Sequence, residues 1–179
     1  MTPTDIFAIS HRDTLGRART GMLRLAHGDV PTPAFMPVGT HASVKGLTAP
    51  QIEDTGARML LCNAFHLSLR PGESLIRDLG GLHAFMNWHR PILTDSGGYQ
   101  IFSLNPKITE DGARFRSVYD GALIELSPEG AMAIQQELGA DIAMMLDVCT
   151  GLPAERARVE ADLERTLRWA ERCRAAHQR

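Results

Sequence analysis

Residues 91–100 read Pro-Ile-Leu-Thr-Asp-Ser-Gly-Gly-Tyr-Gln, an apolar run that ends in a carboxylate and two glycines. The apolar part predicts a buried strand, with Asp95 where the strand runs out. Gly97 and Gly98 would let a flat ligand approach the backbone closely, and Tyr99 offers a ring for stacking. The pattern suits recognition of a planar, donor-rich molecule such as a purine base. A strand followed by a tight turn, with Asp95 capping local amides, explains the same residues equally well.

The bulk composition is that of an ordinary globular protein. The chain has 179 residues, of which 44% are hydrophobic and 22% charged, which fits one domain with a real core. The formal net charge is −2, so the chain as a whole does not attract nucleic acid electrostatically. A local basic face remains open.

The cysteines indicate a reducing compartment. Cys62, Cys149 and Cys173 are odd in number and widely spaced, which argues against a disulfide framework. No pair has the spacing of a zinc knuckle, so no metal site is expected within this chain. No apolar run of membrane-spanning length and no leader pattern occur. We therefore expect a cytoplasmic protein with no membrane association.

A helix followed by an apolar strand occurs repeatedly. Residues 48–51 resemble a capping box and predict a short helix, with a buried strand over 58–63. Residues 127–129 open a second helix with proline near its first position, and a strand over 141–147 follows. Residues 71–95 fit the same scheme more loosely.

This alternation predicts parallel strands with both faces of the sheet covered. The three strands end in Asn63, Asp95 and Asp147. In a TIM-type β/α barrel, the chemistry lies at the carboxyl ends of the strands. One such residue would be expected to cap a loop, but three that converge favour a site. A complete barrel takes about 250 residues, so we expect only the first half of one.

Other segments precede, interrupt and follow this half-barrel in the sequence. Residues 19–38 predict an N-terminal hairpin that turns at 27–29, and residues 105–126 predict a small inserted antiparallel ribbon with two Asp-Gly turns. A final helix runs from near Pro153 almost to the end, and its many arginines are typical of a solvated face.

An open half-barrel would expose a strand edge and apolar surface. The chain is therefore expected to aggregate, to form homo-oligomers or to need a partner polypeptide.

Several separate blocks resemble the tRNA-guanine transglycosylases, the queuine tRNA-ribosyltransferases. They occur in order and with compatible spacing from about residue 10 to the end. The block at 90–100 is the most specific, and the others are TPAFMPVGT at 32–40, NAFHL at 63–67, LRPG at 69–72, GGLH at 80–83, LSPE at 126–129 and DVCT at 147–150.

The resemblance implies an enzyme that replaces guanine in a tRNA anticodon with a 7-deazaguanine such as preQ1 or queuine, in queuosine biosynthesis. It implies tRNA and a guanine-type base as partners. Carried over by position, Asp95 is similar to the family's proton acceptor. The residues similar to its base-binding set are Asp95, Ser96, Gly97, Gly98, Tyr99 and Asp147.

The residue types suit those roles. Guanine presents N1–H beside an amino group, and the Asp147 carboxylate could accept from both. Asp95 could pass a proton to the departing base and take one from the incoming base; a hydrophobic wall and the Asp147 charge would both raise its pKa. Tyr99 would stack on a base taken out of the RNA stack. Asn63 and His66 could orient Asp95, although either could be purely structural.

Two positions in the last of these blocks need a separate interpretation. Cys149 is better explained by packing than by nucleophilic catalysis, because no base lies beside it in the sequence. Position 148 is a valine, where bacterial members of the family usually carry an acidic residue, which leaves the fine substrate preference open.

The family's nucleophilic aspartate and its zinc ligands, three cysteines and a histidine, lie in the second half of its barrel. Residues 1–179 are therefore expected to be the amino-terminal half of the barrel domain, with no cofactor of their own and with Zn²⁺ bound in the second half.

Two hypotheses about function follow. The chain is part of a transglycosylase, inactive alone and completed by a second polypeptide, with an archaeosine-type enzyme as a lesser variant. Alternatively, it is a truncated, non-catalytic remnant or subunit that keeps part of a purine or tRNA pocket.

Overall fold

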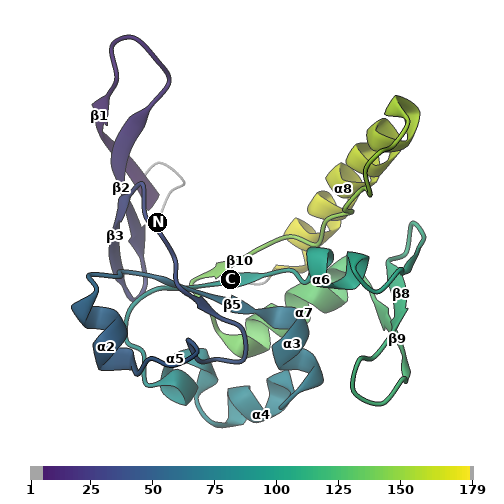
Figure 1. The fold of residues 1–179 in the computed structure, drawn as a ribbon, viewed down its shortest axis with the longest axis horizontal. Coiled ribbons are helices and arrows are strands. Elements are labelled where there is room, and N and C mark those ends of the chain that lie inside the picture. Colours follow the sequence, from purple (N-terminus) through teal and green to yellow (C-terminus); the bar gives the residue numbers. More distant parts are fainter. Residues whose placement is uncertain (1–5, 178–179) are drawn as a thin grey trace.

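Four short strands form a parallel sheet at the centre of the computed structural model, which describes residues 6–177 (Figure 1). The strands are β4 (Val38–Gly39), β5 (Leu60–Asn63), β6 (Ile92–Asp95) and β10 (Ile142–Ala143), in the order β10-β6-β5-β4. Helices alternate with these strands along the chain, so the predicted α/β architecture with parallel pairing is confirmed.

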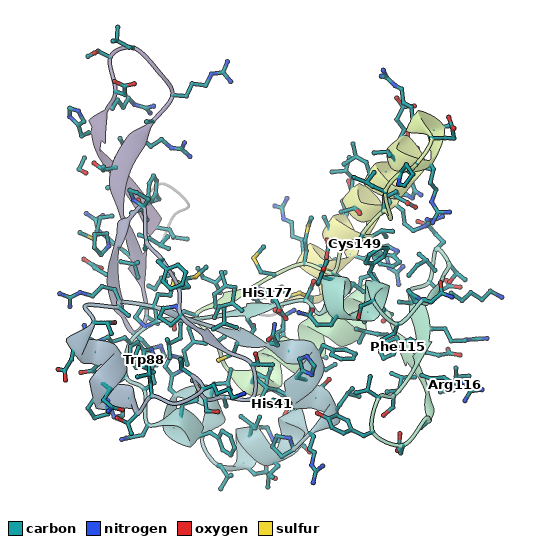
Figure 2. All side chains as sticks on the ribbon, viewed as in Figure 1. His41, Trp88, Phe115, Arg116, Cys149 and His177 are labelled. Carbon is teal, nitrogen blue, oxygen red and sulfur yellow. The ribbon has the colours of Figure 1, made fainter. Side chains whose placement is uncertain are left out.

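The helices between the strands gather on one side of the sheet (Figure 1). They are α2 (Ala49–Asp54), α3 (Ala64–Leu69), α4 (Glu73–Asp78), α5 (Gly81–Met86) and α7 (Pro128–Leu138). Leu60, Cys62 and Ile92 of the sheet are fully buried in a core with Leu67 and Trp88. Figure 2 shows Trp88 within this helix-covered part of the molecule.

The opposite face of the sheet carries a row of side chains that the described helices do not cover. Val38, Leu61, Leu93 and Ile142 are register partners across the four strands and so lie on one face. Val38 is 49% exposed, and the other three are half-buried. The prediction that both faces are covered is therefore wrong for the part of the chain that the structure describes. We call this row the open face.

The local signals for helix starts are confirmed. The Thr48 N–H donates to Gln51 Oε1 at 2.9 Å at the beginning of α2. Ser127 Oγ accepts from the Gly130 N–H at 3.1 Å at the beginning of α7. Gly139 ends α7 with φ of 73°, a left-handed conformation that glycine adopts without a steric penalty.

The predicted strand over 141–147 is wrong in its length, because β10 ends at Ala143. Beyond that point the Met144 N–H still donates to Thr94 O of β6 at 3.1 Å, and the Gln135 side chain adds two further hydrogen bonds to the Met144 backbone. Its Nε2 donates to Met144 O and its Oε1 accepts from Met144 N, both at 2.8 Å. Residues 144–147 therefore leave the sheet without losing these backbone hydrogen bonds, and Asp147 lies on an irregular segment.

An antiparallel sheet rises from one end of the molecule (Figure 1). The predicted hairpin is confirmed as β2 (Arg19–Leu25) and β3 (Gly28–Thr32), but its second strand begins at Gly28, within the predicted turn, and ends at Thr32 rather than near residue 38. A third strand, β1 (Phe7–Arg12), pairs with β2 and was not predicted.

The predicted ribbon is also confirmed, as β7 (Lys107–Ile108), β8 (Ala113–Arg116) and β9 (Leu123–Leu126). The short helix α6 (Gly98–Phe102) leads into it. Phe115 of β8, labelled in Figure 2, packs in a second core with Phe65, Leu146 and Trp169.

The long C-terminal helix α8 (Arg156–Ala176) is confirmed as well. It buries Asp162, Trp169 and Cys173, whereas its stripe of Val159, Leu163 and Leu167 stays exposed. None of the described helices combines the length and the apolar character needed to cross a lipid bilayer.

Candidate functional site

Asp95 and Asn63 are the last residues of neighbouring parallel strands and are register partners. Their side chains meet, because Asn63 Nδ2 donates to Asp95 Oδ2. The Ala64 N–H donates to Asp95 Oδ1 at 3.2 Å, and Gln100 Nε2 approaches Oδ2 at 3.4 Å. The carboxylate is therefore held in one orientation at the carboxyl edge of the sheet.

Burial raises the pKa of the Asp95 carboxyl above its ordinary value. Hydrogen bonds from Asn63 and from the backbone of Ala64 and Gly97, and the nearby His66, oppose this shift without cancelling it. A carboxyl with a raised pKa holds a proton more readily than a free aspartate. The site can therefore exchange a proton at Asp95.

Asp147 lies against the turn that follows Asp95. Ser96 Oγ donates to Asp147 Oδ1 at 3.2 Å and accepts from the Gly98 N–H at 3.3 Å. A β-carbon on Gly98 would overlap Asp147 Oδ1, and one on Gly97, where φ is +82°, would lie 2.8 Å from Phe65 Cβ. Both glycines are thus required by close packing, and the turn brings the two aspartates to the same end of the sheet.

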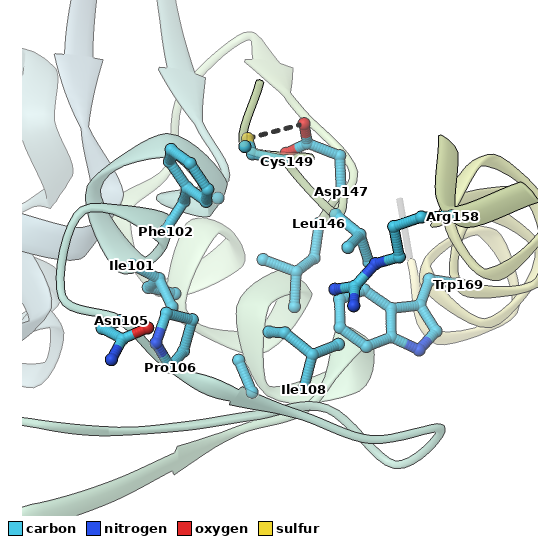
Figure 3. Close-up of a pocket in the computed structure, with 14 residues that line it drawn as sticks. Ile101, Phe102, Asn105, Pro106, Ile108, Leu146, Asp147, Cys149, Arg158 and Trp169 are labelled. Carbon is cyan, nitrogen blue, oxygen red and sulfur yellow. Dashed lines mark hydrogen bonds between the residues drawn. The ribbon is translucent and has the colours of Figure 1, made fainter. Parts of the chain in front are cut away.

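Cys149 forms the neighbouring wall of the site. Its Sγ donates to Asp147 Oδ2 at 3.6 Å (Figure 3). Burial, followed by the Asp147 charge, raises the pKa of this thiol to about 11. The residue is therefore a protonated thiol at neutral pH, in agreement with a packing role.

A cavity of about 140 Å³ opens beside Asp147, between α6, the start of the ribbon and α8 (Figure 3). Ile101, Phe102, Leu146 and Trp169 supply its apolar walls, and Arg158 also lines it. Asp95 and Tyr99 do not line this cavity. This cavity therefore adjoins Asp147 but not Asp95.

Tyr99 projects from α6 and is 70% exposed. Its ring centroid lies 6.3 Å from that of Phe102, which leaves most of the ring free to stack on another planar group.

His66 lies near Asp95, but no hydrogen bond between the two side chains is observed. Its Nδ1 is buried without a hydrogen-bond partner among the described residues. Burial, and then the neighbouring His41, lower its pKa. His66 therefore influences Asp95 through charge, whereas Asn63 orients it directly.

Sequence reasoning did not identify Gln100 as a partner of Asp95. Gln100 lies five positions after Asp95, and the first turn of α6 brings its amide back to the strand end. No pattern in the sequence marks this contact.

The cysteines of this chain do not form a zinc site of the expected family type. Cys62, Cys149 and Cys173 are all free, and residues 6–177 hold no cluster of three cysteines with a histidine. The possible metal-binding cluster that the described residues do form is His27, His83 and Asp141. These residues lie in three separate segments, which is why the spacing of cysteines and histidines did not reveal them.

The fold and the site together define an α/β protein with a polar site at the carboxyl edge of a parallel sheet, built from two strand-end side chains and a glycine turn. Comparison with known proteins narrows this class. The family model described as queuine tRNA-ribosyltransferase matches residues 13–179, and the chain belongs to this family.

Curated relatives support the assignment. The queuine tRNA-ribosyltransferase of Gloeobacter violaceus is 53% identical over 181 residues, which cover 100% of this chain and 47% of the relative. That of Pelotomaculum thermopropionicum is 54% identical over 175 residues, covering 97% and 47% of the two chains. That of a Nostoc species is 54% identical over 165 residues, covering 91% and 44%. The chain thus spans about half the length of the curated relatives it matches.

Proposed function

We propose that this chain forms the amino-terminal half of a TIM-type barrel that exchanges guanine in tRNA for a 7-deazaguanine in queuosine biosynthesis, in the cytoplasm. The observation that carries the proposal is the paired arrangement of Asp95 and Asp147 around the glycine turn at the carboxyl edge of the sheet. The names of the relatives, each a queuine tRNA-ribosyltransferase, support the reaction class.

The open face supports the half-barrel. Val38, Leu61 and Leu93 form an apolar row on the side opposite the helices. Strands β4 and β10 end the sheet, and neither has a second strand partner among residues 6–177. Further strands would pair with these edges and bury the row, as closure of a barrel requires.

Asp95 is the proposed group that gives a proton to the departing guanine and takes one from the incoming base. Its raised pKa and its fixed orientation suit both steps. Asn63 and Gln100 hold the carboxylate in place by hydrogen bonds, and His66 acts on it through charge.

Asp147 is the proposed recognition group for the N1–H and amino edge of the base. Ser96 already donates to one of its oxygens at 3.2 Å, which keeps the carboxylate facing the turn. Gly97 and Gly98 allow Phe65 and Asp147 to pack against the turn, and the exposed Tyr99 ring would stack on the face of the base. The nucleophile and the zinc ligands of the family would come from outside this chain.

A second candidate is a non-catalytic subunit or remnant that keeps part of this purine or tRNA pocket. The fixed carboxylate of Asp95 and the glycine turn beside Asp147 would serve this candidate equally well. The two candidates share the base-binding half-site and differ in whether base exchange takes place.

Two measurements on the chain test these proposals. Guanine binding is measured by calorimetry for the chain and for Asp147→Asn, with Asp120→Asn in an exposed turn as the matched control. We expect Asp147→Asn to weaken binding at least about tenfold, because one charge-assisted acceptor pair is lost, and the control to bind normally. Failure of the unaltered chain to bind guanine, or equal binding by Asp147→Asn, would refute the half-site.

Incorporation of radiolabelled guanine into tRNA then distinguishes the two candidates. Exchange by the chain, lost in Asp95→Asn, supports the enzyme. Guanine binding without exchange, with or without the carboxyl-terminal half of the Gloeobacter violaceus relative, supports the binding subunit.

A further inference from the structure

A buried carboxylate lies at the amino edge of the parallel sheet, opposite the edge that carries Asp95. Asp141 immediately precedes β10, and its side chain is 1% exposed. Its Oδ1 accepts from the backbone N–H of His27 at 3.1 Å and from His27 Nδ1 at 2.9 Å. Its Oδ2 accepts from His83 Nε2 at 3.1 Å and from the Ile92 N–H at 2.9 Å.

The two imidazoles reach this carboxylate from different parts of the fold. His27 lies in the turn between β2 and β3, and His83 lies in α5. Their rings stack with centroids 3.5 Å apart and an interplanar angle of 15°. A potential ligand atom from each of the three residues lies within 4.8 Å of the other two.

We propose that His27, His83 and Asp141 bind a divalent transition-metal ion of the Zn²⁺ or Co²⁺ type. Two imidazole nitrogens with one carboxylate oxygen are a common ligand set for such ions. In a tetrahedral site with bonds of about 2.0 Å, neighbouring ligand atoms are about 3.3 Å apart. His27 Nδ1 lies 2.9 Å from Asp141 Oδ1 and His83 Nε2 lies 3.1 Å from Asp141 Oδ2, so each ring nitrogen is already at about that separation from one oxygen of the carboxylate.

The ion would take the place of the hydrogens on His27 Nδ1 and His83 Nε2, which now point at Asp141. His27 Nδ1 and His83 Nε2 would each coordinate through a lone pair, and the remaining proton of each neutral ring would sit on its other nitrogen. The backbone N–H groups of His27 and Ile92 would continue to donate to Asp141 and to fix its orientation, as outer hydrogen bonds do in metal sites.

Coordination requires the ring stack to open, because each ring plane must turn toward a shared ion. The His27 side chain is 41% exposed on a turn, whereas the His83 side chain is 11% exposed. His27 is therefore the ligand free to move, and its exposed side leaves room for a water molecule as fourth ligand. The bound ion would cross-link the β2–β3 turn to α5 and to the start of β10.

Metal titration of the chain tests this site directly. Co²⁺ and Zn²⁺ are added to the metal-free chain, to His27→Ala and to His89→Ala, whose exposed histidine lies outside the cluster. We expect saturable 1:1 binding with a visible Co²⁺ spectrum that lacks a thiolate charge-transfer band. His27→Ala should bind at least about tenfold more weakly, whereas His89→Ala should bind like the unaltered chain.

Thermal unfolding supplies a second readout. Zn²⁺ should raise the Tm of the chain and of His89→Ala, because it binds the folded state, and should not raise the Tm of His27→Ala. Because His27 is exposed, His27→Ala is expected to keep the far-UV circular dichroism of the unaltered chain. Absence of saturable binding, equal affinity in His27→Ala or a thiolate band would each overturn the proposal. These results do not depend on guanine binding, since the two sites lie at opposite edges of the sheet.

Discussion

Two aspartates at opposite edges of one sheet show how burial and hydrogen bonding compete to set the pKa of a carboxyl group. Burial raises the pKa of both carboxyls. At Asp95 this effect outweighs the bonds from Asn63, Ala64 and Gly97, so the pKa is raised. At Asp141 the bonds from His83, Ile92 and His27 outweigh burial and hold the pKa well below its usual range. Asp95 is thus suited to hold a proton and Asp141 to stay anionic.

The Asp147 charge should control the reactivity of Cys149. Because that charge and burial raise the thiol pKa to about 11, alkylation by iodoacetamide should be slow at pH 8 and should accelerate as the pH rises. Asp147→Asn removes the charge and should move the rate profile to lower pH. The measurement is the alkylation rate against pH, with the modified residue identified by mass spectrometry.

The other two thiols and a matched variant serve as controls for this experiment. Cys62 and Cys173 are buried and should not react in the folded chain. Asp120→Asn, in a distant exposed turn, should leave the profile unchanged. A profile for Asp147→Asn that coincides with that of the unaltered chain would contradict the proposed cause.

At the scale of elements, α8 is held to the rest of the molecule by its buried Trp169 and Cys173 and by polar contacts around one turn of the ribbon. Trp169 Nε1 donates to Glu110 O at 2.9 Å, and Arg172 Nη1 donates to the same oxygen at 2.7 Å. Arg172 also bonds Glu129 of α7 at 2.6 and 2.7 Å. These arginine contacts modify the expectation of a purely solvated face, since Arg168 and Arg172 link three elements.

Arg172→Ala should lower the free energy of unfolding by about 1–2 kcal/mol, because it removes a bidentate ion pair and two bonds to backbone oxygens. Arg174→Ala, an exposed neighbour on the same helix, should change it by less than about 0.5 kcal/mol. Urea unfolding monitored by tryptophan fluorescence measures both.

The Arg172 effect should also depend on pH. Arg172 lowers the pKa of Glu129 from 4.5 to about 2, so the ion pair stabilises the fold fully above about pH 4.5 and less as the pH falls toward 2. The stability difference between the unaltered chain and Arg172→Ala should therefore shrink across that window. A difference that is constant from pH 7 to pH 3 would show that the carboxylate plays no part.

At the scale of the whole molecule, the parallel sheet is covered by helices on one side only. The antiparallel sheet and α8 rise on the other side, on either flank of the open face (Figure 1). Unpaired strand edges and exposed apolar rows favour association with another chain. The described part of the chain is thus an open layered structure rather than a closed barrel.

We expect the chain to self-associate through this face. Val38→Lys places a charge on the edge strand β4, at a position that is 49% exposed, and should shift the equilibrium toward monomer. Leu79→Lys is the matched control. Leu79 is 53% exposed and lies at the end of α4, on the helix side of the sheet, so this substitution should have no effect on association. Sedimentation velocity over a range of concentrations measures both.

A single monomeric species of the unaltered chain at every concentration, with sharp thermal unfolding, would rule out association through the open face. Equal association by Val38→Lys and the unaltered chain would place the contact elsewhere on the surface.

Local signals allowed much of the architecture to be predicted. Thr48 and Ser127 mark helix starts, Gly139 marks a helix end, and Asn63 and Asp95 do end their strands. The helix signals depend on residues within four positions of one another, so their hydrogen bonds are encoded locally. The predicted strand over 141–147 is too long, because β10 ends at Ala143 and the Met144 backbone bonds the Gln135 side chain as well as Thr94 O of β6. β1 was missed because its stability depends on pairing with β2 rather than on its own pattern.

The sequence alone determined the family, the parallel α/β order and the two aspartates of the candidate site, because motif blocks and the periodicity of apolar residues lie along the chain. Only the tertiary structure decided which side chains meet across it. The contact of Ser96 with Asp147, and the cluster of His27, His83 and Asp141, join residues that are far apart in sequence. Such contacts form when packing of the sheet brings separate segments to a common edge, and no local pattern records that packing.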